Sequence, residues 1–218
     1  MASQESVGRL LGIVSVLSVV FGAYPAHAVE KGDWLLRVGA GHVAPNDSSS
    51  GFSGAPTIEA AVDSSTNLAL TIVYMVTDNV GVELVGALPF KHDINGAGSG
   101  GSGLGKVAET KQLPPTVLAQ YYLNPTGNVR PYLGAGLNYT FFFDEQTTGA
   151  LAGTDLSLSS SLGLAAEAGV DVDISKNMFL NVAVWYMDIE TTATSSAIGT
   201  ADVKINPWVA FAGLGWRF

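Results

Sequence analysis

Hydrophobic residues alternate with small or polar residues along most of the chain from residue 34 onward. A period of two is typical of β-strands whose two faces meet different surroundings. The pattern predicts eight strands, at about Trp34–Val43, Asn67–Thr77, Val80–Lys91, Glu109–Leu123, Arg130–Phe143, Ser160–Ile174, Met178–Glu190 and Asp202–Phe218. An even number of strands closes an up-and-down antiparallel barrel, so we predict an all-β fold of this kind.

The connections between the predicted strands alternate in length. Three are short turns and four are long and polar: Thr77–Asn79, Asn124–Val129 and Ser175–Asn177 against Ala44–Thr66, His92–Ala108, Asp144–Ser159 and Thr191–Ala201. Short turns at one rim and long loops at the other are typical of bacterial outer-membrane barrels, in which the short turns face the periplasm. We therefore expect a transmembrane barrel with both termini in the periplasm.

The two faces of the predicted strands differ in charge. Charged residues share a face with glycine, whereas the opposite face is Leu, Val and aromatic over most of its length. Hydrocarbon cannot solvate an unpaired charge, so the charged face should line the interior and the apolar face should contact lipid. A soluble sandwich or lipocalin would reverse this polarity. The inward charges predicted toward the periplasmic side are Arg37, Glu83, Glu167, Asp171 and Arg217.

These inward charges have two interpretations. They would line an ion-selective pore if the interior were open, or pair with one another if it were filled. The interior of an eight-stranded barrel is just wide enough for side chains to fill it. We therefore expect the charges to pair into a plug, with a blind apolar cavity on the outer side.

Residues 1–28 have the pattern of a secretory signal peptide. Arg9 precedes the apolar run Leu10–Ala23, and Ala26 and Ala28 occupy the small-residue cleavage positions. The run is shorter than the roughly 20 apolar residues that a membrane helix needs. Cleavage after Ala28 would leave residues 29–218 as a single outer-membrane barrel domain.

Composition excludes several functions. The chain has 10 basic and 19 acidic residues, a formal net charge of −9, and no cysteine. Nucleic-acid binding requires a basic surface, which this balance does not provide. Disulfides and cysteine-based metal or redox sites are impossible. We expect no metal and no cofactor.

Several motifs resemble the OmpW family of small outer-membrane barrels, whose relatives include AlkL-type alkane-uptake proteins. The motifs are Tyr74–Leu84, Leu113–Thr116, Arg130–Thr140, Val184–Ile189 and the final segment Ile205–Phe218. The resemblance implies a narrow hydrophobic channel that is open to the outside, closed toward the periplasm, and used for uptake of small hydrophobic compounds. It also implies that the terminal Phe218 is presented to the outer-membrane assembly machinery. Membrane lipid and lipopolysaccharide are the other expected partners.

The expected channel lining follows from the resemblance together with the alternation. Val85 and Trp185 fall at matching motif positions and are bulky apolar residues on an otherwise small or polar face. Leu118 and Met187 lie on the same inward face of their strands. We predict that these four side chains line the path of the solute.

Prolines within the predicted strands suggest where a solute leaves the barrel. Proline lacks a backbone N–H, so it interrupts the hydrogen-bond ladder of a sheet. The candidates for a lateral exit are Pro89, Pro114, Pro115 and Pro207. The alternative is that these prolines merely end strands near the outer rim, and for Pro114 and Pro115 the two interpretations carry equal weight.

Other candidate chemistry is weak. The segment Gly100–Lys106 fits a phosphate-loop pattern, but Val107 follows the lysine and no helix is expected, so a flexible Gly/Ser loop is the better interpretation. His42 and His92, the latter beside Asp93, are expected to be solvated residues near the rim rather than catalytic groups. We predict no enzyme activity. A structural or receptor barrel without transport is the main alternative, and a barrel enzyme a weaker one.

Overall fold

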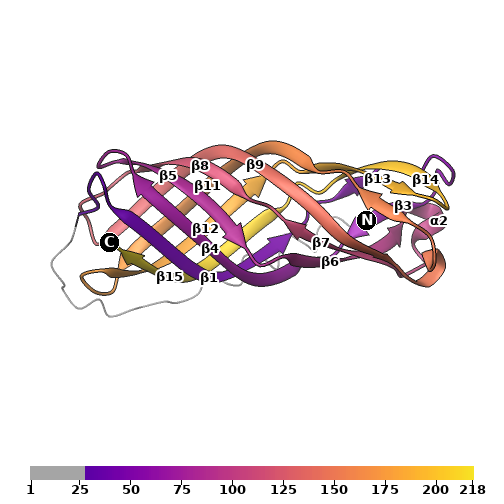
Figure 1. Ribbon diagram of the computed structural model, residues 1–218, viewed down its shortest axis with the longest axis horizontal. Helices are drawn as coiled ribbons and strands as arrows, with labels where there is room; N and C mark the ends of the chain where they lie inside the picture. Colours follow the sequence, from indigo (N-terminus) through magenta and orange to yellow (C-terminus); the bar gives the residue numbers. More distant parts are fainter. Residues whose placement is uncertain (1–27) are drawn as a thin grey trace, which may run out of the picture.

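The computed structural model describes residues 28–218, and the predicted signal peptide up to residue 27 lies outside the described residues. Eight antiparallel strands form a closed ring in which β11 pairs with both β12 and β9 (Figure 1). In ring order these strands are β11 (Ser161–Asp173), β12 (Met178–Met187), β15 (Trp208–Arg217), β1 (Trp34–Ala44), β4 (Ser65–Met75), β5 (Val80–Ala87), β8 (Thr116–Tyr122) and β9 (Val129–Thr147). The predicted eight-stranded barrel is confirmed.

Beyond the ring, the wall continues as two four-stranded sheets, one of which shares β9 with the ring. One consists of β3 (Glu59–Val62), β6 (Phe90–Ala97), β7 (Lys106–Leu113) and the end of β9; the other consists of β2 (Ser48–Ser49), β10 (Leu156–Leu158), β13 (Glu190–Ser195) and β14 (Gly199–Lys204). The helical turns α2 (Gly98–Gly101) and η1 (Gly149–Leu151) lie in the connections of this part. We call the closed ring the belt half and the two sheets the distal half.

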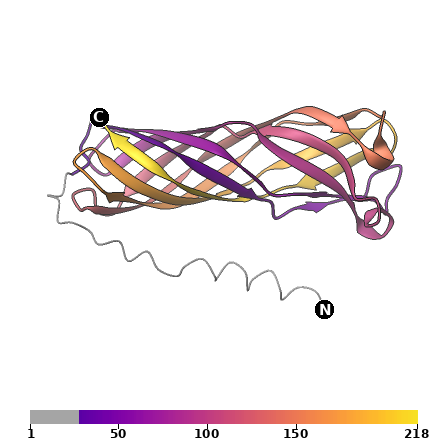
Figure 2. The same ribbon diagram turned by 90° about the horizontal axis from the view of Figure 1, so that it is seen from below.

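The molecule is an elongated barrel. The C-terminus lies at the free end of the belt half, and β3, β13, β14 and α2 lie at the opposite end of the long axis (Figures 1 and 2). No helix within residues 28–218 is long and apolar enough to cross a membrane.

Much of what the alternation predicted as long loops is strand. The segment 191–201 is most of a hairpin in which β13 pairs with β14 from Glu190↔Lys204 to Ser195↔Gly199. Similarly, β6 continues to Ala97 and β7 begins at Lys106, inside the segment predicted as the second loop. These segments are rich in Thr, Ser, Ala and Gly, and this composition predicted loops. In the structure, cross-strand hydrogen bonds make them part of the wall.

The predicted face of Phe90 is wrong. The alternation placed it outside with Leu88, but Phe90 is 2% exposed whereas Leu88 is 54% exposed. Pro89 lies between β5 and β6, where the strand is interrupted. The interruption shifts the alternation by one residue. The inward residues are therefore odd-numbered before Pro89, in β5, and even-numbered after it, in β6.

A band of apolar side chains covers the outside of the belt half. Trp34 stacks against Tyr74 at 4.9 Å between ring centroids near one edge of the band, and Tyr186 lies 5.1 Å from Trp208 near the other. Between these aromatic pairs the outward residues are mainly Leu and Val. Aromatic girdles on both sides of an aliphatic band are typical of a barrel wall that contacts a lipid bilayer.

A charge in the middle of this band should destabilise the barrel. Val182 is 57% exposed and pairs with Ala212, midway between the two girdles on its strand. We expect Val182→Arg to lower the free energy of unfolding in lipid by about 2–4 kcal/mol. Thr194→Arg, at an outward position on β13, should change it by less than about 0.5 kcal/mol. Urea unfolding in lipid vesicles measures both, and equal effects would contradict the assignment of the band to lipid.

Candidate functional site

A buried cluster of charges closes the interior of the belt half. The Arg37 guanidinium donates from Nη1 to Glu83 Oε1 at 2.9 Å and from Nη2 to Asp171 Oδ2 at 3.0 Å. A third bond joins Arg37 Nη2 to the Tyr122 hydroxyl at 2.6 Å, and the guanidinium lies 4.7 Å from the centroid of the Tyr132 ring. The side chains of Arg37, Glu83 and Asp171 are essentially inaccessible to solvent.

Glu167 lies in the same cluster and is held by an amide. Gln120 donates from Nε2 to Glu167 Oε2 at 2.7 Å. A Cβ atom at Gly134 would lie 2.8 Å from that same oxygen, so glycine is what leaves room for the carboxylate. Four of the five predicted inward charges are thus together in the interior.

The fifth predicted charge, Arg217, has a different place. It is partly exposed at the end of the barrel that carries the C-terminus, and it donates to the backbone oxygens of Ala28 at 3.1 Å and Lys176 at 2.7 Å. The cluster has instead a second ion pair that sequence reasoning missed, between Arg130 and Asp173. The alternation places both residues on the inward face, Asp173 two positions after the predicted Asp171 and Arg130 on the same face of its strand as Gly134. This was the available indication in the sequence.

A small apolar cavity lies next to the charge cluster. Val85, Trp185 and Met187 line it together with Phe90 and Pro114, and its empty volume is about 420 Å³, part of which opens to solvent. We call it the middle cavity. Three of the four predicted lining residues therefore border one space, whereas Leu118 is buried in the same apolar cluster without bordering the cavity.

Trp185 is the largest side chain of the middle cavity. Its ring contacts Phe211 edge-on at 5.8 Å between centroids. Its indole Nε1 is buried and has no hydrogen-bond partner within residues 28–218. An apolar wall with one unused donor can bind an apolar body and a single acceptor atom.

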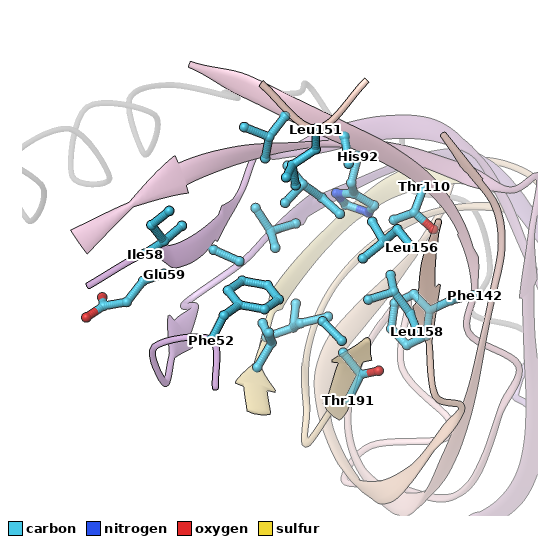
Figure 3. A pocket seen from close by; sticks show the side chains of 18 of the residues that line it. Phe52, Ile58, Glu59, His92, Thr110, Phe142, Leu151, Leu156, Leu158 and Thr191 are labelled. Carbon is cyan, nitrogen blue, oxygen red and sulfur yellow. The ribbon is translucent and has the colours of Figure 1, made fainter. Parts of the chain in front are cut away.

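A larger apolar cavity occupies the distal half (Figure 3). Its empty volume is about 760 Å³, part of which opens to solvent. The walls come from both distal sheets and include Phe52, Ile58, Phe142, Leu156 and Leu158. Gln112 borders this distal cavity as well as the middle cavity, so the two spaces are neighbours.

Sequence reasoning missed the distal cavity because the polarity of the wall reverses there. In the belt half the outward residues are mainly apolar, and the charged residues face inward among apolar side chains such as Phe179 and Phe211. On β14 the inward residues are Ala201 and Val203, followed by Ile205, and the outward ones are Asp202 and Lys204. The available sign of this reversed polarity was an apolar residue at every second position within a Thr- and Ser-rich segment.

The candidate exit prolines lie at two interruptions of the wall. The register of β5 with β8 ends at Val85↔Thr116, and that of β6 with β7 resumes at Phe90↔Gln112. Residues 86–89 and 113–115 lie between these pairs, so Pro89, Pro114 and Pro115 are at one interruption. Pro207 is at the other, between β14 and β15, where its oxygen accepts a hydrogen bond from the Met187 amide at 3.2 Å.

The two histidines differ from each other. His42 is exposed as predicted, with its Nδ1 2.7 Å from Thr66 Oγ1. The prediction of a solvated His92 is wrong: its side chain is 1% exposed and lines the distal cavity. The shift of parity at Pro89 turns it inward. Lys106, at the end of the phosphate-loop pattern, pairs with Asp93 and Glu109 at 2.7 Å each.

A closed eight-stranded ring with an apolar outer band, an inner charge cluster and short turns at one end defines an outer-membrane β-barrel. Residues 30–218 match the family model described as OmpW family, and the chain belongs to that family. Being such a barrel, it contacts membrane lipid through its outer band.

Curated and solved relatives agree with this assignment. The chain is 46% identical to outer membrane protein W of Vibrio cholerae over 94% of this chain and 97% of that protein. The crystal structure of OprG from Pseudomonas aeruginosa has a TM-score of 0.81 and 42% identity, covering 88% of this chain and 98% of that one. Two more distant relatives are AlkL of Ectopseudomonas oleovorans, 26% identical over 89% of this chain and 87% of that protein, and the dibenzothiophene metabolism operon protein PahQ of Pseudomonas aeruginosa, 29% identical over 87% and 90%.

Removing the central cation should destabilise the charge cluster. We expect Arg37→Ala to lower the free energy of unfolding by about 3–5 kcal/mol, because Glu83 and Asp171 stay buried without their partner. Adding Glu83→Gln and Asp171→Asn to this variant should recover part of the loss. Arg217→Ala should cost less, since Arg217 is only partly buried and donates to backbone oxygens. Urea unfolding in lipid vesicles tests this order, and a larger loss for Arg217→Ala would contradict it.

Proposed function

We propose that the chain is a channel for small hydrophobic molecules that is closed toward the periplasm and releases its solute sideways into the membrane. The observation that carries this proposal is the order in which apolar and charged surroundings follow one another along the interior of the barrel. An apolar distal cavity neighbours an apolar middle cavity, and beyond that the interior is filled by the Arg37 cluster. An apolar solute finds favourable surroundings in the cavities and none among buried charges.

The orientation of the barrel is part of the proposal. The short turns at residues 76–79, 123–128 and 174–177 lie at the end that carries Phe218, and in outer-membrane barrels such turns face the periplasm. Both termini are then periplasmic and the distal half projects outward among lipopolysaccharide. Phe218 is 72% exposed, which agrees with its presentation to the assembly machinery.

The relatives and the lining support hydrophobic solutes. PahQ is named for an operon of dibenzothiophene metabolism, and dibenzothiophene is a flat, apolar aromatic molecule. Val85, Trp185 and Met187 offer aliphatic, aromatic and thioether surface at the middle cavity, with Leu118 packed in the same apolar cluster. Such surfaces bind apolar molecules without requiring matched polar groups.

The side exit is proposed at the interruption between Gly86 and Pro114. Both residues line the middle cavity, and the wall there lacks a continuous ladder. A Cβ atom at Gly86 would meet nothing within 4 Å, so this point of the interruption is not covered by neighbouring side chains. Pro207 is a weaker candidate, because a hydrogen bond from the Met187 amide joins the strands there.

A charge in the middle cavity should stop passage. We expect Val85→Asp and Trp185→Asp each to lower the uptake of a hydrophobic probe by about tenfold or more, because an unsatisfied charge then stands where an apolar solute must lie. Thr194→Asp, on the outer face of β13, is the control. Uptake by cells is compared at equal surface abundance, with heat-modifiable gel migration as the check of folding. Normal folding with unchanged uptake would favour a structural or receptor barrel instead.

A large side chain at the interruption should slow release. We expect Gly86→Phe to fold normally, since space is available for its side chain, and to reduce probe uptake several-fold by covering the interruption. Gly103→Phe, at a position in the α2–β7 connection with equal space around its Cβ, is the matched control. Equal uptake by the two variants would contradict an exit at Gly86 and leave the cavity assignment intact.

A catalytic role has no support in the contacts of the histidines. His92 Nδ1 contacts the backbone oxygen of Asp63 at 2.7 Å rather than a carboxylate that would orient a catalytic base. Within residues 28–218, the hydrogen-bond partner of His42 is the Thr66 hydroxyl, which is not a carboxylate either. We therefore keep passage of solutes as the function.

A further inference from the structure

We infer that His92 makes the distal cavity selective for hydrophobic molecules that carry one hydrogen-bond donor, such as phenols and long-chain alcohols. This inference rests on the proposed function and names the class of solute. It follows from the position of the ring, the partner of each ring nitrogen and the surroundings of the free nitrogen.

The position of the ring is fixed by its strand and its partner. Cross-strand pairing sets His92 opposite Thr110 on β7, inside the distal half. Figure 3 shows the imidazole among the lining side chains, close to Leu156 and Thr110. With a side chain that is 1% exposed, the ring belongs to the cavity wall and not to the outer surface.

The partner of Nδ1 determines which nitrogen holds the proton. Nδ1 lies 2.7 Å from the backbone oxygen of Asp63, and a carbonyl oxygen only accepts hydrogen bonds. Nδ1 therefore carries hydrogen. Burial lowers the pKa of His92 below its ordinary value, so the ring is neutral at pH 7 and Nε2 holds a lone pair.

The lone pair of Nε2 is unused. Within residues 28–218, Nε2 is buried and has no hydrogen-bond partner. The nearby charges are already engaged or directed elsewhere. Asp93 pairs with Lys106 at 2.7 Å, and the Asp63 carboxylate accepts a hydrogen bond from Asn95 Nδ2 at 3.0 Å. Figure 3 shows the Glu59 carboxylate pointing away from the other lining side chains. A buried acceptor without a donor is costly, and a ligand that brings a donor removes that cost.

Two threonines of the cavity wall already direct their hydroxyls to backbone oxygens, which leaves the Gln112 amide as the other neutral polar side chain of the lining. Thr191 donates its hydroxyl to the backbone oxygen of Ser159 at 2.7 Å. The Thr110 hydroxyl lies 3.4 Å from each of the two backbone oxygens of Lys111 and Phe143, to which it can donate. Aliphatic and aromatic side chains form most of the remaining surface. An O–H or N–H group on an otherwise apolar solute therefore has a well-defined acceptor at His92 Nε2.

Two probes that differ in one hydrogen-bond donor test this inference. 1-Naphthol carries an O–H group, whereas 1-methoxynaphthalene has the same ring system and oxygen without a donor. Initial uptake rates are measured in cells that carry the protein, with the rate of cells lacking it subtracted. We expect His92→Phe to lower the ratio of naphthol to methoxynaphthalene uptake about fivefold, the worth of one hydrogen bond, and to leave methoxynaphthalene uptake unchanged. His42→Phe, the same change at an exposed histidine, should behave as wild type.

The outcomes separate this inference from the proposed function. An unchanged ratio in His92→Phe, or an equal fall for both probes, would overturn the role of His92 while passage of hydrophobes stands. Wild-type rates no higher than background for both probes would overturn the proposed function and this inference with it.

A measurement on the wild-type protein does not depend on folding of the variant. In lipid nanodiscs, the ¹⁵N resonance of His92 Nε2 should shift on addition of 1-naphthol, because its lone pair then accepts a hydrogen bond. Addition of 1-methoxynaphthalene should leave the resonance in place. A resonance that does not move with 1-naphthol would overturn the inference.

Discussion

The closure of the backbone hydrogen-bond ladder within the lipid band is the constraint on which the rest of the structure depends. Hydrocarbon offers no partner to a backbone N–H or C=O group, so a sheet can span a bilayer only as a closed ring. Here the ring is complete from β11 around to β9 throughout the belt half. The interruptions at Pro89, Pro114 and Pro207 begin only near its outer edge, and beyond them the wall divides into two sheets. Water can hydrate exposed edges there, and the space between the sheets becomes a cavity.

The same boundary reverses the polarity of the wall. Inside the band, charged groups must face inward, and a narrow ring brings them close enough to pair around Arg37. Outside the band, the outer face meets water, so Asp202 and Lys204 face out and Val203 faces in. Along one strand path the interior therefore passes from the buried charges of the belt half to the apolar lining of the distal half. The distal cavity follows from where the outer face leaves the lipid band, whereas the middle cavity is lined by inward apolar residues of the belt strands such as Val85 and Trp185.

The alternation predicted the belt half well because one simple rule applies to all eight strands there. Faces, strand number and four of the five inward charges all follow from it. The rule failed where its assumptions changed: Pro89 shifted the parity of β6, which turned Phe90 and His92 inward, and Thr-rich strands such as β13 resembled loops. The distal cavity required knowledge of which strands pair beyond the band. Single-sequence periodicity does not contain that information, because two sheets and one ring present the same alternation.

In the proposed pathway, the free energy of an apolar solute decides which way the solute leaves the interior. Moving from the middle cavity toward the C-terminal end would place it among Arg37, Glu83 and Asp171, whose hydrogen bonds to one another would have to be broken. Moving sideways past Gly86 exchanges one apolar environment for another, since the band outside is lipid, and such an exchange costs little. The charge cluster thus has a directing role in the proposed pathway. By blocking the axial route, the cluster leaves the side of the barrel as the lower barrier in this pathway.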